Sequence, residues 1–273
     1  MIIRLILGFG MSAAIGALGY WRHSLTRSGW LGAIVVGTIT TGLGSWAWGI
    51  LIIAFFGFSS ALSKIGAGRK MALAADKWSK SDQRDFGQTL ANGGVPALLA
   101  VGYALAPHPA WWAATLGAVG TAAADTWATE IGTLSRVAPR LITSGRRVER
   151  GTSGGVSALG LGATLAGAAT IGAVGWLAVA AGVGNGVTAG GWMLAAAIVG
   201  GVGGSLADSL LGATVQQMRW CTVCERETER IVHRCGTATA AWRGWRWLDN
   251  DWVNAISIAS GAALAVGVWR IFA

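Results

Sequence analysis

This chain contains eight runs of mainly apolar residues, which polar or glycine-rich segments separate. A helix needs about 20 mainly apolar residues to cross roughly 30 Å of hydrocarbon. The second and third runs are short, so a turn at 42–45 and a single long helix over 30–62 both fit the sequence. We predict an all-α, polytopic membrane helix bundle with seven to eight spans. The candidate spans are 2–20, 30–43, 46–62, 90–106, 111–131, 156–181, 192–213 and 253–271.

The composition excludes an ordinary soluble domain. Hydrophobic residues make up 53% of the 273 residues and charged residues only 12%, against about 25% charged residues in typical soluble domains. Many of the 43 glycines lie within apolar runs, which indicates close packing of helices in lipid. We expect one transmembrane domain over 1–273, with a cytoplasmic loop that contains cysteine and histidine at 214–251.

The positive charge is distributed unevenly along the chain. The formal net charge is +9, which in a soluble protein would suggest nucleic acid as a partner. Here nearly all lysines and arginines fall in the loops after the first, third, fifth and seventh runs, and the loops between those carry none. Basic loops face the cytoplasm in membrane proteins. We therefore expect the N-terminus outside, the four basic loops in the cytoplasm, the bilayer as a partner and no nucleic acid.

Three carboxylates fall inside apolar runs, where ionisable groups are costly and usually functional. Asp125 and Glu130 are five residues apart, about 140° on an ideal helix, so they can share an ion only where the helix ends or breaks. Gly204, Asp208 and Gly212 form an i, i+4 stripe, which predicts that Asp208 faces the bundle. Converging carboxylates suit Mg²⁺. A proton relay would use the same residue types, and an acid satisfied by an arginine or a helix N-terminus would be only structural.

A basic segment at 139–157 comes immediately before the sixth run. Thr152 or Ser153 can cap the following helix, whose free N–H groups form an anion site, and glycines permit a backbone nest around phosphate oxygens. A positive-inside loop explains the arginines equally well. Together with the buried acids, the segment favours phosphate binding through Arg140, Arg146, Arg147, Arg150, Gly151, Gly154 and Gly155.

All three cysteines lie in one short stretch, with the spacing Cys221-x2-Cys224-x8-His233-x-Cys235. Three thiolates and one imidazole suit a tetrahedral structural Zn²⁺. Reduced thiols without a metal are the alternative. In either case we expect a structural role and a reducing compartment.

Six sequence blocks, in order along the chain, resemble a family of integral membrane proteins that includes plant phytyl-phosphate kinase and human transmembrane protein 19. The blocks are N-G-G at 92–94, A-D-T-W-A-T-E-I-G at 124–132, P-R-L-I-T at 139–143, G-T-S-G-G-V-S at 151–157, G-S-L-A-D-S-L-L-G-A-T-V-Q at 204–216 and L-D-N-D-W-V-N at 248–254. The resemblance implies a CTP-dependent kinase of isoprenoid metabolism that converts a prenyl monophosphate of phytyl type to the diphosphate. It also implies a distant relation to dolichol kinases and CDP-diacylglycerol synthases.

On this reading Asp125, Glu130 and Asp208 are catalytic and hold Mg²⁺, directly or through water. The phosphates of CTP and of the prenyl lipid would contact Arg140, Arg146, Arg147, Thr152, Ser153, Gly154 and Gly155. Polar supports or nucleotide contacts would be Asn92, Ser209, Gln216, Asp249, Asn250 and Asn254. Asn92 and Asn254 could instead only cap helices. A transporter or lipid scramblase that uses the buried acids, or a CTP:lipid-phosphate cytidylyltransferase that attacks the α-phosphate, are the competing functions.

Overall fold

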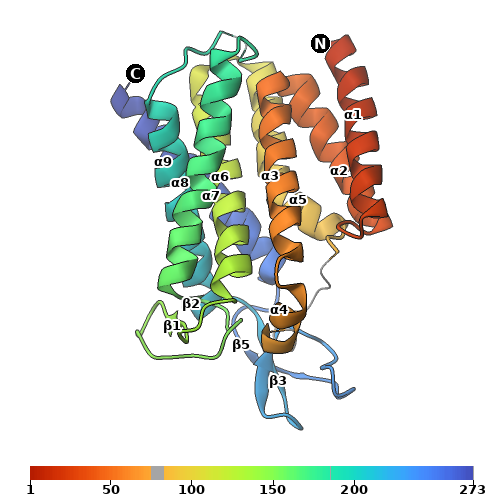
Figure 1. Ribbon diagram of the computed structural model, residues 1–273, viewed down its shortest axis with the longest axis vertical. Helices are drawn as coiled ribbons and strands as arrows, with labels where there is room; N and C mark the ends of the chain where they lie inside the picture. The colour runs from red at the N-terminus through yellow and green to blue at the C-terminus, as the bar shows by residue number, and fades with distance from the viewer. Residues whose placement is uncertain (75–82, 185, 273) are drawn as a thin grey trace.

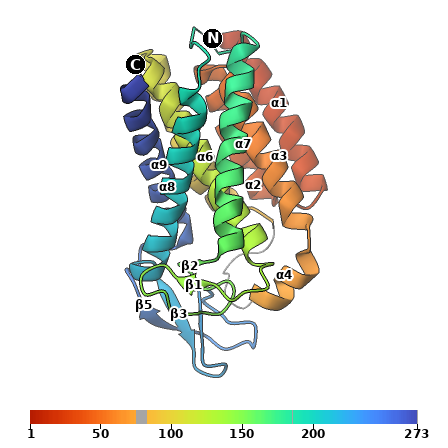
Figure 2. The same cartoon turned by 60° about the vertical axis from the view of Figure 1, so that its left-hand side comes forward.

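Long helices packed side by side form the body of the molecule, and the strands lie together at one end of it (Figures 1 and 2). The computed structural model describes residues 1–74, 83–184 and 186–272. The helical elements are α1 (Ile2–Trp21), α2 (Arg27–Ile39), a π-helical segment η1 (Thr40–Gly44), α3 (Trp46–Lys64), α4 (Ala67–Ala74), α5 (Phe86–Leu105), α6 (Pro109–Gly132), α7 (Ala158–Ala180), α8 (Trp192–Thr214) and α9 (Asn250–Phe272).

Every predicted apolar run corresponds to a helix. The run at 30–43 is α2 continued by η1, and extended backbone at Ser45 separates it from α3, so the break near 42–45 is present and one long helix over 30–62 is wrong. Five helices, α1, α3, α7, α8 and α9, are long and apolar enough to cross a membrane. The number of seven to eight spans stays a prediction.

The protein is mostly helical, but the prediction of an all-α chain needs a correction. Antiparallel strands β1 (Arg140–Leu141) and β2 (Gly155–Val156) close the segment before α7. Strands β3 (Met218–Cys221), β4 (Arg226–Thr228) and β5 (Ala240–Arg243) form a second sheet in the order β4-β3-β5, inside the region predicted as a loop. Backbone N–H and C=O groups that lie outside a helix still need partners, and pairing of short strands supplies them.

Helix α6 lies at the centre of the bundle. It packs against α3, α5, α7, α8 and α9, and its residues from Trp112 to Ala124 are continuously buried. Close approach depends on Gly117 of α6, Gly200 of α8 and Gly261 of α9, because a Cβ on Gly261 would overlap Thr121 Oγ1 and lie 2.6 Å from the Gly200 carbonyl oxygen. The Thr121 hydroxyl is 2.8 Å from the Gly117 carbonyl oxygen and 3.1 Å from that of Gly200, and it joins α6 to α8.

The basic connections share one end of the bundle. Helix α4 and the connections after α6 and α8 lie at the end that carries the strands, and both termini lie at the opposite end (Figure 1). The connection between α1 and α2 meets the same basic end, since Thr26 N donates to the Arg84 carbonyl oxygen at 3.0 Å. Residues 75–82, part of the second basic loop, are outside the described residues. A common side for the basic loops is therefore consistent with the bundle, and its assignment to the cytoplasm stays a prediction.

The contact among the three glycines predicts that Gly261→Ala lowers the Tm of the protein in detergent. Overpacking of a close contact costs about 1–3 kcal/mol. Gly267→Ala is the matched control on the same helix, because a Cβ at Gly267 meets nothing within 4 Å, and alanine is favoured over glycine in a helix by about 1 kcal/mol. Equal Tm values for the two variants would contradict the close packing of α6, α8 and α9.

Candidate functional site

A polar cavity of about 300 Å³ lies at the end of the bundle that carries the strands. Its wall combines the ends of α3, α5, α6, α7, α8 and α9 with the segment that precedes α7. The charged and amide side chains that line it are Arg84, Gln88, Asn92, Asp125, Glu130, Arg150, Asp208, Glu229, Asn250 and Asn254. Such a wall suits a charged, hydrated ligand better than an apolar one.

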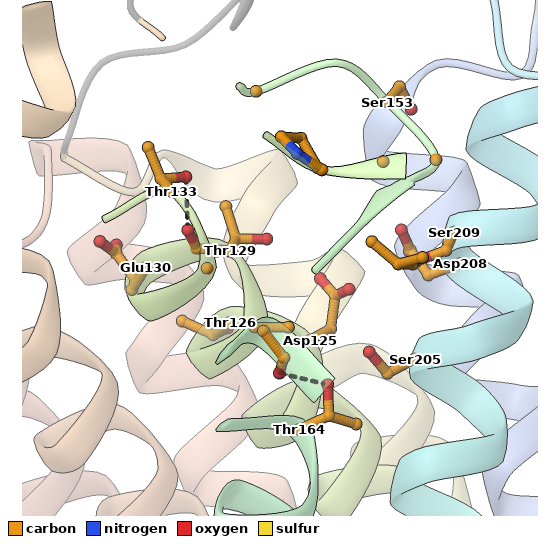
Figure 3. A pocket seen from close by; sticks show the side chains of 18 of the residues that line it. Asp125, Thr126, Thr129, Glu130, Thr133, Ser153, Thr164, Ser205, Asp208 and Ser209 are labelled. Carbon is orange, nitrogen blue, oxygen red and sulfur yellow. Dashed lines mark hydrogen bonds between the residues drawn. The ribbon is translucent and has the colours of Figure 1, made fainter. Parts of the chain in front are cut away.

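Asp125 of α6 and Asp208 of α8 lie next to each other in this wall (Figure 3). One oxygen of Asp208, Oδ2, is buried and has no hydrogen-bond partner among the described residues. A buried polar atom without a hydrogen-bond partner is costly. The pair therefore fits a divalent cation, whose charge would compensate both acids.

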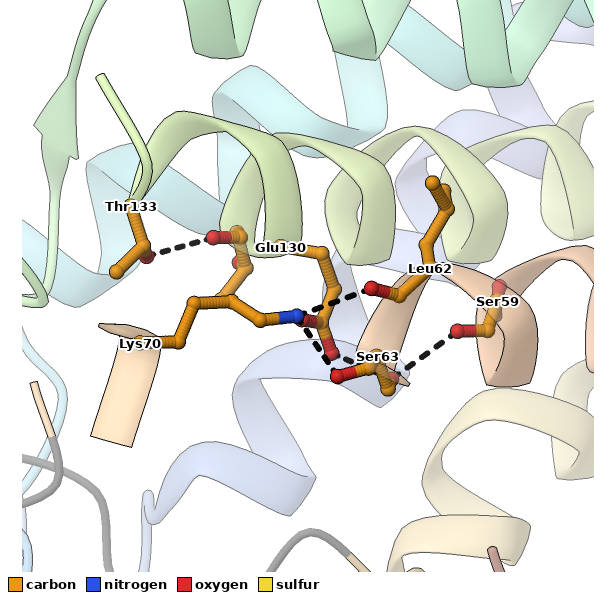
Figure 4. A network of polar contacts seen from close by, with 7 residues as sticks. Ser59, Leu62, Ser63, Lys70, Glu130 and Thr133 are labelled. Atoms are coloured by element: carbon orange, nitrogen blue, oxygen red, sulfur yellow. Dashed lines mark hydrogen bonds and ion pairs between the residues drawn. The ribbon is translucent and has the colours of Figure 1, made fainter. Parts of the chain in front are cut away.

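Glu130 does not join this pair, which corrects the expectation that three acids converge. Its carboxylate forms an ion pair with Lys70 of α4 and accepts a hydrogen bond from Ser63 Oγ at 2.5 Å (Figure 4). Lys70 is buried, and its Nζ also donates to the carbonyl oxygens of Leu62 and Ser63 at 3.0 and 2.8 Å. Because α6 continues as a regular helix to Gly132, five residues rotate Glu130 away from Asp125.

The segment before α7 forms a tight turn against α8. Gly154 adopts a φ of +79°, and a Cβ there would lie 2.7 Å from Ala213 Cα. The N–H groups of Thr152 and Gly155 already donate within the segment, to Glu149 and Thr152 carbonyl oxygens at 3.2 and 3.0 Å. These two N–H groups are therefore already engaged, and the backbone nest expected over 152–155 has fewer N–H groups available for phosphate than predicted.

The helix cap differs from the prediction. Ser157, rather than Thr152 or Ser153, caps α7, and its Oγ accepts from Gly160 N at 3.1 Å. Ser153 Oγ donates instead to Oε1 of the buried Gln216 at 2.6 Å. Gln216 thus contacts the turn through Ser153 and does not line the cavity.

The arginines of this segment separate into two groups. Arg140, Arg146 and Arg147 are exposed and are not among the residues that line the cavity, and Arg140 Nη1 donates to the Gly145 carbonyl oxygen at 2.8 Å. Arg150 does line the cavity, with its guanidinium held by the carbonyl oxygens of Ser135 and Arg136 at 2.9 and 3.0 Å. Of the four arginines predicted to bind phosphate, Arg150 alone therefore lines the cavity.

The remaining predicted residues divide in a similar way. Asn92, Ser209, Asn250 and Asn254 line the cavity. Asn92 lies within α5 and donates to the Gln88 carbonyl oxygen at 3.0 Å, so it does not cap a helix. Asp249 is not in the wall; it accepts from the N–H groups at the start of α9, at 3.1 and 3.2 Å, and serves as a helix cap.

The prediction missed Arg84, Gln88 and Lys70. Gln88 and Asp85 form a capping box at the start of α5, with Gln88 N donating to Asp85 Oδ1 at 2.8 Å and Asp85 N donating to Gln88 Oε1 at 3.1 Å. The sequence D-x-x-Q is a helix-start signal and could have placed Arg84 directly before the helix. Nothing in the sequence pairs Lys70 with Glu130, because 60 residues separate them.

Away from the cavity, the second sheet brings the cysteines and one histidine together. The ligand atoms of Cys221, Cys224, His233 and Cys235 all lie within 4.8 Å of one another. Cys235 Sγ is 3.6 Å from Cys221 Sγ and 3.3 Å from His233 Nδ1. Hydrogen bonds with Thr237 and His233 lower the pKa of Cys235 to about 6, which favours the thiolate that metals bind. Among the described residues this is the one group of three or more possible ligands this close together.

Comparisons with known proteins support the prediction that this is an integral membrane protein. The family model described as integral membrane protein DUF92 matches residues 10–262. Protein PGR of Arabidopsis thaliana is 32% identical, over 93% of this chain and 92% of its own length.

Two uncharacterized membrane proteins are similar as well. The one from Methanocaldococcus jannaschii is 29% identical over 79% of this chain and 85% of its own. The one from Synechocystis is 30% identical over 90% of this chain and 83% of its own. No solved structure matches the chain significantly. The match to the family model and the near full-length similarity to the Arabidopsis protein show that this chain belongs to the integral membrane family DUF92.

Proposed function

We propose that this protein is a membrane kinase that uses CTP and Mg²⁺ to convert a prenyl monophosphate of phytyl type to the diphosphate. The observation that carries the proposal is the neighbouring pair Asp125 and Asp208 in a polar cavity that also offers Arg84 and Arg150. The sequence blocks that resemble the phytyl-phosphate kinase family support CTP and the prenyl substrate. With the basic end in the cytoplasm, as the distribution of lysine and arginine suggests, the cavity would open to soluble nucleotide.

The chemistry requires charge compensation more than a strong base. A monoester phosphate has a second pKa near 6, so it is already an anionic nucleophile at neutral pH. One of its oxygens attacks the γ-phosphorus of the triphosphate, the new P–O bond forms, and the bond to the β–γ bridging oxygen breaks with release of CDP. Such a transfer depends on positioning of the reactants and on neutralisation of their negative charge.

This chain's own residues supply both requirements. Asp125 and Asp208 would hold Mg²⁺, which neutralises phosphate oxygens when it is bound. Arg84 and Arg150, which both line the cavity, would bind phosphate oxygens. Glu130, fixed by Lys70, would hold α6 against α3 and α4 rather than bind the metal.

The position of the acids favours an enzyme over a transporter. Asp125 is seven residues from the end of α6 and Asp208 six from the end of α8, or about 10 Å along each axis. Transporters usually place their sites near the midplane of the bilayer. A cavity at one end suits a ligand that arrives from one side of the membrane.

We further propose that Cys221, Cys224, His233 and Cys235 hold a structural Zn²⁺. Three thiolates and one imidazole complete a tetrahedral site without an open position, and the four side chains already converge. The Zn²⁺ would stabilise the second sheet and take no part in phosphoryl transfer.

Asp208→Asn should lower CTP-dependent kinase turnover by about 10²- to 10³-fold, because it removes charge at the metal and keeps the shape of the side chain. Turnover of detergent-purified protein with phytyl monophosphate is measured against Mg²⁺ concentration, together with Tm. Glu225→Gln, at an exposed turn of the second sheet, removes the same charge and should leave turnover unchanged. Folded Asp208→Asn protein with normal turnover would remove Asp208 from the site, and release of diphosphate instead of CDP would identify a cytidylyltransferase.

Arg150→Gln and Arg147→Gln test which arginine binds phosphate. Loss of a charge-assisted hydrogen bond of roughly 1.5–3 kcal/mol should raise KM for CTP or lower kcat by about tenfold or more in Arg150→Gln. Arg147→Gln is the matched control in the same segment, and its kinetics should stay close to those of the wild type. The reverse order of effects would place the phosphate outside the cavity, over the exposed arginines.

Elemental analysis should find about one zinc per chain in protein purified without chelator, as a four-ligand site predicts. His233→Asn should lose that zinc and lower Tm, while the folded fraction keeps its turnover. His23→Asn is the control, since His23 lies outside the cluster at a positive φ of 55° that asparagine tolerates. Wild-type protein without zinc would refute the proposal.

A further inference from the structure

A second cavity, of about 80 Å³, lies among α1, α2, α3 and α5. Apolar side chains and glycines form most of its wall, including Ile15 of α1, Val36 of α2 and Ile52 of α3. On α3 its lining runs from Gly49 to Phe56, or about 10 Å along the helix axis. That is about one third of the roughly 30 Å of hydrocarbon in a bilayer.

The apolar cavity and the polar cavity meet. Arg84, Gln88 and Asn92 line both of them. Gln88 and Asn92 are one turn apart on α5, and Arg84 precedes that helix. The Arg84 guanidinium donates to Ser60 Oγ at 3.1 Å and lies 5.9 Å from the centre of the Phe56 ring, which itself lines the apolar cavity. One cation therefore stands at the junction of a polar and an apolar space.

The apolar cavity also reaches the outer surface of the bundle. Met11 of α1 and Ile53 of α3 line it and are 41% and 37% exposed. Both lie on helices that are long and apolar enough to cross a membrane, so the exposed part of each side chain would face lipid. A chain in the bilayer could enter between α1 and α3 without passing through water.

We propose that this cavity binds the isoprene units nearest the phosphate of the lipid, with the phosphate at Arg84 and the rest of the chain extending between α1 and α3 into the bilayer. A ligand that fits both spaces needs one anionic head and one apolar tail. The narrow apolar space that begins at a single junction suits one chain, whereas a diacyl lipid carries two. This inference rests on the proposed function and names where that function's lipid substrate lies.

Photolabelling tests the tail site without requiring turnover. The probe is phytyl monophosphate with a diazirine in its second isoprene unit from the phosphate, added to wild-type protein in phosphatidylcholine nanodiscs. Peptide mass spectrometry should find the label on cavity-facing residues of α1, α2 or α3, and excess unlabelled phytyl monophosphate should abolish it. Label on α7 or α8, or label that does not respond to competition, would overturn the proposal.

A matched pair of variants gives a second measurement. Ile53→Trp fills the mouth of the cavity, and Ile50→Trp makes the same change one turn away, at a residue that is 39% exposed and does not line it. Ile53→Trp should reduce specific labelling and raise KM for phytyl monophosphate by about tenfold, with KM for CTP unchanged. Ile50→Trp should change either value by less than about twofold. Equal effects of the two variants would contradict the site.

The outcomes separate this inference from the proposed function. Specific labelling of the cavity without CTP-dependent turnover would refute the kinase and support the lipid site. Normal turnover with label elsewhere would support the kinase and overturn the lipid site.

Discussion

Close backbone contact among α6, α8 and α9 determines where the carboxylates of Asp125 and Asp208 meet. In lipid, helices gain little from hydrophobic burial against each other, so they associate where small residues let backbones approach. Gly117, Gly200 and Gly261 provide that contact. Asp125 and Asp208 lie further along the same pair of helices, toward the basic end.

The acids Glu130 and Asp208 differ in how their charge is compensated. Glu130 is neutralised by Lys70, which also binds the carbonyl oxygens at the end of α3 and attaches α4 to the bundle. Asp208 keeps a buried oxygen with no partner in the described part of the chain. A protein holds a costly group of this kind when a ligand completes it, and this difference separates a structural acid from a proposed metal ligand.

The two cavities suit the two parts of an amphipathic substrate, a charged head and an apolar tail. The polar cavity has arginines, amides and acids for phosphates and a cation, and the apolar cavity has aliphatic side chains near a surface that would face lipid. Arg84 stands between them, supported by Ser60 and the Phe56 ring. A bundle arranged in this way could transfer a phosphoryl group while the tail of its substrate stays in the bilayer.

The helices, the inward position of Asp208 and the cluster of cysteines follow from the sequence, because they depend on local apolar length, small-residue spacing and short ligand spacing. The sequence left open whether the chain breaks near Ser45, and the structure places extended backbone there. Tertiary structure alone decided which charged side chains meet. In the folded protein Glu130 lies apart from Asp125 and forms an ion pair with Lys70. Arg150 and Arg84 line the polar cavity, whereas Arg147 does not. Those contacts join residues on different helices and loops, and their geometry is set by packing across the bundle, which a pattern along one chain does not encode.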